Sequence, residues 1–379
     1  MADLILKGGR IIDPANGRDG VDDIAFGDGK VIEVGGDLSV VGAEVVDVRG
    51  LLVVPGLIDL HTHVYWGGTS LGVDAAEVAR RSGTTTFVDA GSAGPGTFHG
   101  FRRHVIEPSP LRIIPYLNVS FPGIFAVSAA VSVGECADLR LLDPRECARV
   151  IRANRDLIAG VKVRVGRSAG GASGVAPLDI ALEVAEETGL PVMAHLDNPP
   201  PSRLEVLSRL RRGDVLTHCF RPFPNAPVGD DGQIREEVIE GRRRGVIFDI
   251  GHGSGSFGFR TAEKMLEAGF LPDVISSDVH AVSINGPAFD QLVTMSKFLC
   301  LGMKLADVIR ASTAAAAAAL GRTDIGRLEI GAAGDATLLE LAEGDFEYRD
   351  VLGEVRTGRQ RLKARGIVVA GRWWHPPRG

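Results

Sequence analysis

The chain has 379 residues, 45% of them hydrophobic and 24% charged, which is enough to build one large globular domain and a smaller one. Its formal net charge of −6 argues against nucleic acid as a partner, and the basic run at 242–244 is interpreted as a solvated helix end. Four cysteines without CxxC spacing indicate free thiols in a reducing compartment. Because the chain shows neither an evident signal peptide nor a bilayer-spanning apolar run, we expect a cytoplasmic protein with no membrane partner.

Both ends of the chain have the pattern of β-strands. In the first 55 residues, short alternating segments separated by glycine-rich turns occupy 4–6, 23–26, 31–34 and 44–48. After about residue 325 the same pattern recurs at 336–341, 346–350, 352–356 and 366–369. We therefore expect one small sheet domain made of residues 1–55 and 325–379.

Between the two ends, residues 56–324 alternate strand-like and helix-like segments. Eight candidate strands occupy 57–61, 85–89, 113–119, 161–165, 192–195, 215–218, 246–250 and 274–277. The candidate helices occupy 74–82, 144–153, 177–188, 202–210, 234–243, 261–268 and 304–318. Eight such units over this length predict an α/β domain folded as a (β/α)8 barrel.

The first barrel strand ends in two histidines, His61 and His63. The stretch 53–60 before them is largely apolar and β-branched, as expected of a buried strand. Because side chains alternate along a strand, both imidazoles point to the same face. Two imidazoles on one face at a strand end can bind one metal ion, which predicts a metal site here.

Three later strands also end in metal-binding side chains. His195 ends the fifth strand, His218 ends the sixth, and Asp278 follows the eighth. A barrel carries its chemistry at the C-terminal ends of its strands, so these side chains are expected to meet the first two histidines there. Any one of them could be an ordinary buried residue, but together they favour a metal centre. The histidines without such a placement, expected on the surface, are His99, His104 and His375.

The fourth strand, 161–165, alternates three valines with Lys162 and Arg164. In a barrel the outward face of a strand packs on apolar helices, so the valines are expected outside and Lys162 inside. An inward lysine needs a partner, because burying an unpaired charge is costly. A Lys162 carboxylated by CO₂ would be an anion able to bridge two cations.

The combined ligand set contains imidazole and carboxylate but no thiolate. This set suits zinc, with manganese or iron also possible. Cys219 directly follows His218 and is expected to face the opposite way, into packing.

A glycine-rich stretch at 253–258 matches the dinucleotide-binding pattern GxGxxG. It belongs to the seventh of eight units, without a separate nucleotide-binding half around it. We therefore interpret it as a close-approach loop at the mouth of the site, next to His252. The chain has no GxSxG elbow and no GxxxxGK[ST] loop, so serine-hydrolase and P-loop hypotheses lose support.

With these motifs in place, the chain resembles the amidohydrolase superfamily of metal-dependent hydrolases. The matching segments are 4–13, 55–63 and 321–336. Segments 248–257 and 294–299 are further similar to a deacetylase branch, often labelled dihydroorotase-like, that includes esterases of acetylated α-hydroxy acids. The resemblance implies a (β/α)8 TIM barrel with a small β-sandwich domain built from both termini.

Residue by residue, the resemblance implies a site with two zinc ions. Its six expected ligands are His61, His63, carboxylated Lys162, His195, His218 and Asp278. The first two histidines would bind the more buried ion and the other two the more exposed ion. Asp278 would also be the general base that accepts a proton from the attacking water.

Six further side chains are candidates for binding a substrate, namely Arg164, His280, Asn118, His252, Tyr65 and Trp66. Arg164 is the first candidate for a substrate carboxylate, although it could equally form an ion pair within the barrel. Tyr65 and Trp66 could line an aromatic pocket or simply pack in their loop. Asn118 and His252 end the third and seventh strands and could hydrogen-bond a substrate.

The leading hypothesis is a binuclear zinc hydrolase that cleaves an acetyl ester or amide of a small carboxylic acid. The main alternative is a cyclic amide hydrolase acting on dihydroorotate or hydantoin rings with the same metals. Lys162 argues against a mononuclear deaminase, and the six filled ligand positions argue against an inactive scaffold. The expected partner is a small-molecule substrate, and a homo-oligomer is possible.

Overall fold

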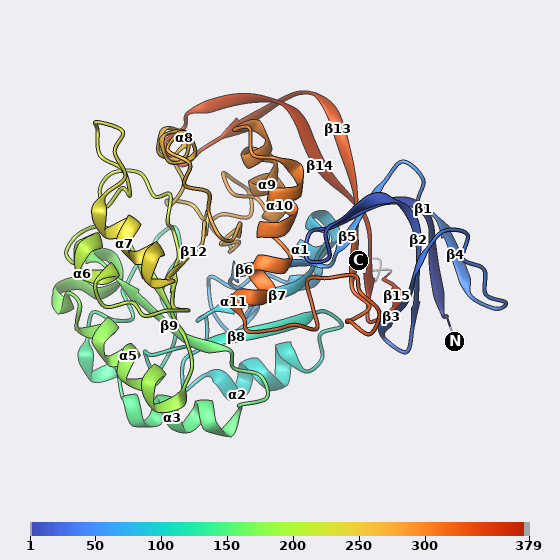
Figure 1. The fold of residues 1–379 in the computed structure, drawn as a ribbon. Helices are drawn as coiled ribbons and strands as arrows, with labels where there is room; N and C mark the ends of the chain where they lie inside the picture. The colour runs from blue at the N-terminus through green and yellow to red at the C-terminus, as the bar shows by residue number, and fades with distance from the viewer. Residues whose placement is uncertain (1, 375–379) are drawn as a thin grey trace.

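The computed structural model describes residues 2–374 and places them in two β-sheets, the second of which is surrounded by helices (Figure 1). The change from one sheet to the other falls between β5 (Leu52–Pro55) and β6 (Leu57–Thr62). The domain limits 1–55 with 325–379 and 56–324 stay a prediction, and residues 375–379 of that tail, with His375, lie outside the described residues.

The first sheet takes its eight strands from both ends of the chain, in the order β15-β14-β13-β5-β1-β2-β3 with β4 paired to β1. Besides β5, its strands are β1 (Leu4–Asp13), β2 (Arg18–Gly27), β3 (Lys30–Gly35), β4 (Glu44–Asp47), β13 (Ala336–Arg349), β14 (Val355–Val369) and β15 (Arg372–Trp373). Leu338 of β13 pairs with Val53 of β5, which joins the two ends of the chain. The β-rich ends therefore share one sheet, whereas the two-layer sandwich stays a prediction.

The second sheet has seven parallel strands in the order β12-β11-β10-β9-β8-β7-β6. After β6 they are β7 (Thr84–Ala90), β8 (Arg112–Asn118), β9 (Gly160–Val165), β10 (Val192–Leu196), β11 (Val215–Leu216) and β12 (Ile247–Phe248). The eighth predicted strand is an extended segment held by single bridges, Asp249 to Val274 on one side and Thr62 to Val279 on the other. These bridges close the curled sheet into a TIM-like barrel, as the resemblance implies.

Helices alternate with the barrel strands. They are α1 (Ala75–Ser82), α2 (Phe98–Phe101), α3 (Pro144–Ala153), α4 (Arg167–Gly170), α5 (Ala176–Thr188), α6 (Arg203–Leu207), α7 (Glu236–Arg244), α8 (Phe259–Glu267), α9 (Gln291–Cys300), α10 (Leu305–Ala311) and α11 (Ala314–Ala319). The prediction of one helix over 304–318 is wrong, because the carbonyl of Ser312 leaves the helical ladder and accepts from the Ile58 amide of β6. Helix α9 was not predicted.

Local capping signals set where the helices begin and end. The Asp74 side chain accepts from the Ala76 amide at the start of α1, and Gly83 ends that helix with φ at +68°. Asp143 caps α3 in the same way, with Pro144 in its first turn. These stops return the chain to the next strand.

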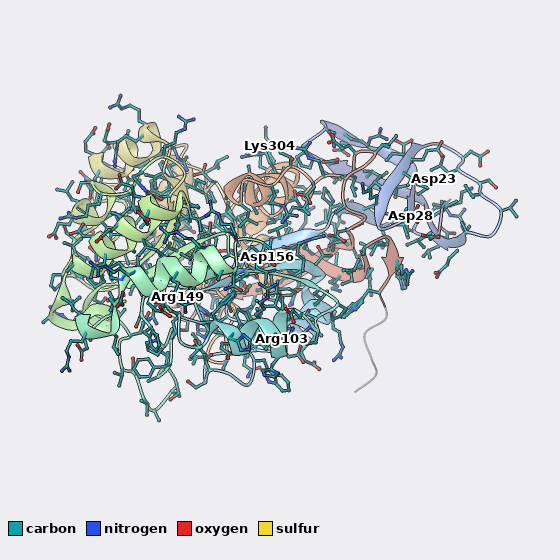
Figure 2. All side chains as sticks on the ribbon, turned by 90° about the horizontal axis from the view of Figure 1, so that it is seen from below. Asp23, Asp28, Arg103, Arg149, Asp156 and Lys304 are labelled. Carbon is teal, nitrogen blue, oxygen red and sulfur yellow. The ribbon has the colours of Figure 1, made fainter. Side chains whose placement is uncertain are left out.

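Charged side chains of both signs cover the outside of the barrel. In Figure 2, Arg103, Arg149 and Asp156 lie on its helical side, away from the first sheet that carries Asp28. Within residues 2–374, no helix has the length and apolar character needed to cross a membrane.

Candidate metal centre and catalytic cavity

His61 lies near the end of β6 and His63 directly follows that strand, and each ring is held through one nitrogen. Nδ1 of His61 lies 2.7 Å from Oγ1 of Thr217, which itself donates to Asp249. Because the hydroxyl proton goes to that carboxylate, the Thr217 oxygen accepts from Nδ1–H and leaves Nε2 of His61 a lone pair. Nδ1 of His63 lies 2.9 Å from Oγ of Ser92. Anchoring of this kind is typical of metal-binding histidines.

Lys162 points into the barrel, as predicted, and is fully buried. The alternate residues Val161 and Val163 pack in the main hydrophobic core. Nζ of Lys162 lies 3.4 Å from Nε2 of His61. Burial lowers the pKa of Lys162 to about 7, so a neutral amine, the form that reacts with CO₂, is accessible near neutral pH.

His195 and His218 come from the ends of β10 and β11 and face each other, with Nδ1 of His195 2.7 Å from Nε2 of His218. Nδ1 of His218 donates to the carbonyl oxygen of Gly251, 2.6 Å away, so its Nε2 carries the lone pair. Nε2 of His195 is buried without a hydrogen-bond partner in the described part of the chain. The fold thus brings together the two histidines predicted for the more exposed ion.

Asp278 faces both histidines of β6. Its Oδ1 lies 3.2 Å from Nε2 of His63 and 3.4 Å from Nε2 of His61. Burial raises the pKa of this carboxyl to about 6. The backbone φ is +49° at Asp278 and +62° at His218, in the left-handed region that costs a non-glycine residue roughly 1–3 kcal/mol. Strain at two candidate ligands is typical of a functional site.

The residues of this site fit a bound metal ion. Ligand atoms of His61, His218 and Asp278 all lie within 4.8 Å of one another. Burial lowers the pKa of His61, His195 and His218 well below the ordinary value, which keeps their imidazoles neutral and able to donate a lone pair. Oδ1 of Asp278 and Nε2 of His195 are buried without a hydrogen-bond partner among residues 2–374, and a cation would satisfy both.

A cavity of about 280 Å³ is lined by four of the candidate ligands, His61, His63, His195 and Asp278. Besides candidate ligands, the polar side chains lining it include Arg164, Ser168, Asp197, Arg221, Ser256 and His280. Arg164 also forms an ion pair with buried Glu135 at 3.3 Å. The same side chain can therefore take part in an ion pair within the barrel and still face a substrate carboxylate in the cavity.

Arg221 was not predicted, yet it lines the cavity and donates to Oγ of Ser256 at 3.3 Å. It lies in the loop after β11, where no strand alternation marks a side chain as inward. Its short distance in sequence from His218 is the only signal that could have suggested it.

Two aromatic candidates, Tyr65 and Trp66, do not line this cavity. The Tyr65 ring packs on Phe101, and its hydroxyl donates to the Thr97 carbonyl at 3.3 Å. Trp66 is 62% exposed. These contacts match the loop-packing alternative for Tyr65, and a substrate contact of either aromatic side chain stays a prediction.

Asn118 and His252 are buried beside the site but are used by the protein itself. The Asn118 amide donates to the Gly91 carbonyl at 3.0 Å and accepts from the Ser120 amide at 2.9 Å. Nε2 of His252 lies 2.6 Å from Nζ of Lys297. Neither residue lines the cavity, and both have structural partners, so a substrate contact of Asn118 or His252 stays a prediction.

Comparison with known proteins gives a family match over most of the chain. The sequence model of the amidohydrolase family matches residues 52–206 and 254–373. A deacetylase of Brucella anthropi is 36% identical over 353 residues, covering 93% of this chain and 87% of the relative. A deacetylase of Agrobacterium fabrum is 35% identical over 344 residues, covering 90% and 84%.

Solved structures of similar proteins share this fold, but they are described by other activities. One described as a dihydroorotase superposes with a TM-score of 0.91 at 33% identity, covering 99% of both chains. Another, described as an adenine deaminase, superposes with a TM-score of 0.92 at 29% identity, covering 99% of this chain and 100% of the other. The names of similar proteins therefore cover three different hydrolytic reactions on one scaffold.

Proposed function

The chain belongs to the amidohydrolase family and is a metal-dependent hydrolase, and from this premise we propose that it is a deacetylase. Its substrate would be an acetyl ester or amide of a small carboxylic acid, such as an O-acetylated α-hydroxy acid. Two similar proteins named deacetylase, each matched over most of both chains, support this choice within the family.

The observation that carries the proposal is that two arginines share one cavity with the metal-ligand cluster. Arg164 and Arg221 both line it. A guanidinium group binds a carboxylate through paired N–H donors, which orients the rest of the substrate. The volume of about 280 Å³ suits a small acid rather than a polymer.

The proposed ligands of two zinc ions are His61, His63, carboxylated Lys162, His195, His218 and Asp278. Manganese or iron would suit the same donors. When bound, the metals would lower the pKa of water and polarise the acyl carbonyl.

The remaining steps fall to side chains of the cavity. Asp278 would accept the proton of the attacking water and return it to the leaving alcohol or amine. Nε2 of His280 lies 4.0 Å from Oδ2 of Asp278, beyond direct hydrogen-bond distance, and its ring lines the same cavity, where it would contact the substrate. Arg164 and Arg221 would hold the substrate carboxylate so that the acetyl carbonyl faces the ligand cluster.

A cyclic amide hydrolase is the second candidate, favoured by the similar solved structure described as a dihydroorotase. It would use the same ligands and the same base. A mononuclear deaminase is less well supported, because Nζ of Lys162 lies 3.4 Å from Nε2 of His61 and a bridging lysine has no role with one ion.

Metal analysis together with a substrate panel tests the proposal. The panel contains acetylated α-hydroxy acids, N-acetyl amino acids, dihydroorotate and hydantoin. About two zinc ions per chain with turnover of an acetyl compound supports the deacetylase. Turnover of the cyclic amides alone supports the second candidate, and no turnover by fully loaded protein contradicts both.

A further inference from the structure

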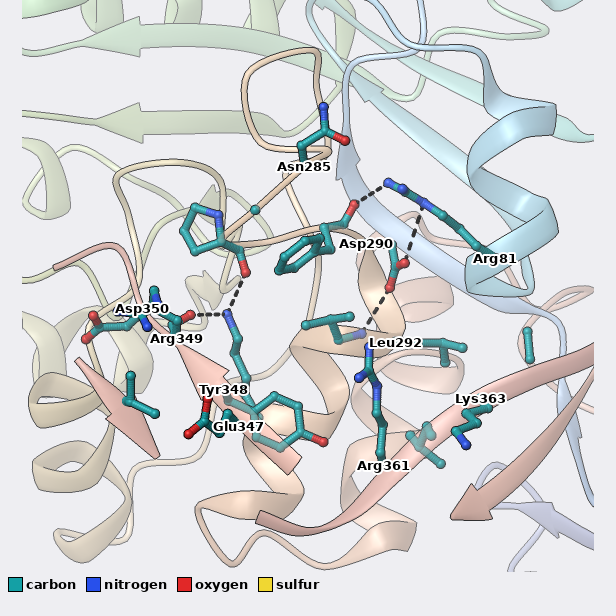
Figure 3. Close-up of a pocket in the computed structure, with 18 of the residues that line it drawn as sticks. Arg81, Asn285, Asp290, Leu292, Glu347, Tyr348, Arg349, Asp350, Arg361 and Lys363 are labelled. Atoms are coloured by element: carbon teal, nitrogen blue, oxygen red, sulfur yellow. Dashed lines mark hydrogen bonds and ion pairs between the residues drawn. The ribbon is translucent and has the colours of Figure 1, made fainter. Parts of the chain in front are cut away.

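A second lysine, Lys297 of α9, is buried outside the metal site, with 1% of its surface exposed. It borders a groove of about 1050 Å³ between α9, the loop before it and the hairpin of β13 and β14. Figure 3 shows this groove, with Arg349 and Asp350 on the hairpin and Asp290 beside Arg81 on the opposite side. A buried lysine with no role in the proposed reaction needs another explanation.

Nζ of Lys297 meets three acceptors from three different parts of the chain. They are the carbonyl oxygens of Pro287 and Arg349, each at 2.8 Å, and Nε2 of His252 at 2.6 Å. An ammonium group has three protons, so all of its donors are used here. The lysine therefore ties the loop before α9 and the end of β13 to the segment that follows β12.

The His252 ring is held in one orientation. Its Nδ1 lies 2.9 Å from the carbonyl oxygen of Gly253, which can only accept, so Nδ1 is protonated and Nε2 accepts from Lys297. The ring also stacks on Phe257 with a centroid distance of 4.7 Å and an interplanar angle of 23°. The Gly253 carbonyl and Lys297 thus favour the same tautomer, and Lys297 supplies the one hydrogen bond that Nε2 of the ring makes within residues 2–374.

The next residue, Gly253, lies against the proposed base. Its amide donates to the Ser277 carbonyl at 2.9 Å, and its φ is +54°. A Cβ atom built on Gly253 would lie only 2.3 Å from Oδ2 of Asp278. The backbone at this glycine is therefore one wall of the space in which the Asp278 carboxylate sits.

We propose that Lys297 is a positioning residue of the catalytic cavity, which acts through His252 to fix the Gly253 backbone against the Asp278 carboxylate. The inference rests on the proposed function, in which Asp278 is the base. Under this proposal, α9 and the hairpin of β13 and β14 help to position the catalytic base, although neither element contributes a proposed metal ligand.

Replacing Lys297 with methionine tests the proposal, because the side chain keeps its length and loses all three donors. We expect kcat to fall roughly 10–100-fold, as for a small misplacement of a catalytic group, with KM nearly unchanged. Lys264→Met is the matched control, since Nζ of Lys264 donates to the Gly229 and Asp230 carbonyls at 3.3 Å, outside the cavity. Its kcat should equal that of the wild type.

A double-mutant cycle separates positioning from a general structural effect. If Lys297 acts through His252, then Lys297→Met combined with His252→Asn should lose no more kcat than the worse single variant. Fully additive losses, or a Lys297→Met variant with wild-type kcat, would overturn the proposal. If the methionine variant does not fold, Lys297→Gln keeps a donor and should show the same selective loss of kcat.

Two further measurements do not depend on turnover. Nitrogen NMR should show Nδ1 of the His252 ring protonated in the wild type, and the resonance of Nε2 should shift in Lys297→Met, because that nitrogen loses its donor. Crystal structures of the wild type and of Lys297→Met should show that the Gly253 backbone lies farther from the Asp278 carboxylate in the variant. If the wild type hydrolyses nothing, the proposed function fails by itself, whereas an unchanged Nε2 resonance of His252 or an unmoved Gly253 overturns the role of Lys297.

Discussion

Nε2 of His63 lies 3.2 Å from Oδ1 of Asp278, which connects the first strand of the barrel to the segment that closes it. No hydrogen bond within residues 2–374 engages Oδ1, and burial raises the pKa of the carboxyl to about 6. An oxygen in this state can take either a cation or a proton. The pair therefore combines a candidate ligand with a candidate base in one place.

Asp278→Asn removes the proposed base while keeping the shape of the side chain. We expect kcat to fall roughly 10²–10⁴-fold, the usual contribution of a general base, with a smaller change in KM. Steady-state kinetics on the acetyl substrate, with zinc content measured in parallel, check this. Asp230→Asn makes the same chemical change on an exposed loop and should leave kcat unchanged.

Arg221→Met removes one of the two guanidinium groups of the cavity. A charge-assisted hydrogen bond to a substrate carboxylate contributes about 1.5–3 kcal/mol, so KM should rise roughly 10–100-fold for a substrate with a free carboxylate. The methyl ester of the same substrate should be hydrolysed equally by both proteins. An equal rise in KM for the acid and its methyl ester would mean that Arg221 supports the loop at Ser256 and does not bind the substrate carboxylate.

Strand alternation and barrel geometry were enough to predict that the candidate metal ligands lie close together. His61, His195, His218 and Asp278 follow strands whose C-terminal ends converge, so their positions depend only on counting along short segments. Lys162 was predicted inward for the same reason, and it is fully buried. Because side chains alternate between the two faces of a regular strand, the sequence pattern alone predicts which way each side chain points.

Two residues near the site were not predicted from the sequence, because one lies in a loop and the other on a helix without a polar face. Arg221 is in a loop, where no period applies. Helix α9 is buried nearly all round, including Lys297, so it shows no amphipathic pattern, although Asp290 caps it by accepting from the Val293 amide. Trp66 shows the converse, since closeness in sequence to His63 does not make a side chain line the cavity.

The metal-free protein should lose stability as the pH falls. Burial lowers the pKa of six histidines, to about 3 for His63, so the folded state binds fewer protons than the unfolded state below about pH 6.5. The six are His61, His63, His195, His218, His252 and His280. Each of these groups makes the unfolded state more favourable as the pH drops below its ordinary pKa.

Five buried carboxyls, those of Asp59, Asp89, Asp249, Asp278 and Asp290, act in the opposite direction. Burial raises the pKa of Asp59 to about 8 and of Asp249 and Asp278 to about 6, which favours the protonated folded state at low pH. The histidines outnumber them, so the melting temperature of metal-free protein should fall between about pH 7 and pH 5. His63→Gln should reduce this fall, whereas replacing the exposed His99 should not change it. A melting temperature that rises on acidification would contradict the neutral-histidine assignment.

Lys162→Met should change the metal content of the protein. If carboxylated Lys162 bridges two ions, zinc per chain should fall from about two to about one, with loss of turnover. Metal analysis after dialysis against zinc, and the melting temperature with and without chelator, measure this. Lys304→Met on the surface is the control. Two tightly held zinc ions in the Lys162 variant would show that the bridge is not needed.

The glycine next to Asp278 allows the geometry of the base to be tested without changing its chemistry. In Gly253→Ala, the new Cβ would lie 2.3 Å from Oδ2 of Asp278 and the backbone would be strained at φ +54°, so the carboxylate must move. We expect kcat to fall roughly 10–100-fold while the protein stays folded. Gly255→Ala is the matched change in the same loop, where a Cβ meets nothing within 4 Å, and its kcat should stay close to that of the wild type. Equal kcat values for the two alanine variants would mean that the position of Asp278 does not limit the reaction, and Asp278 would then be a ligand without a role as the base.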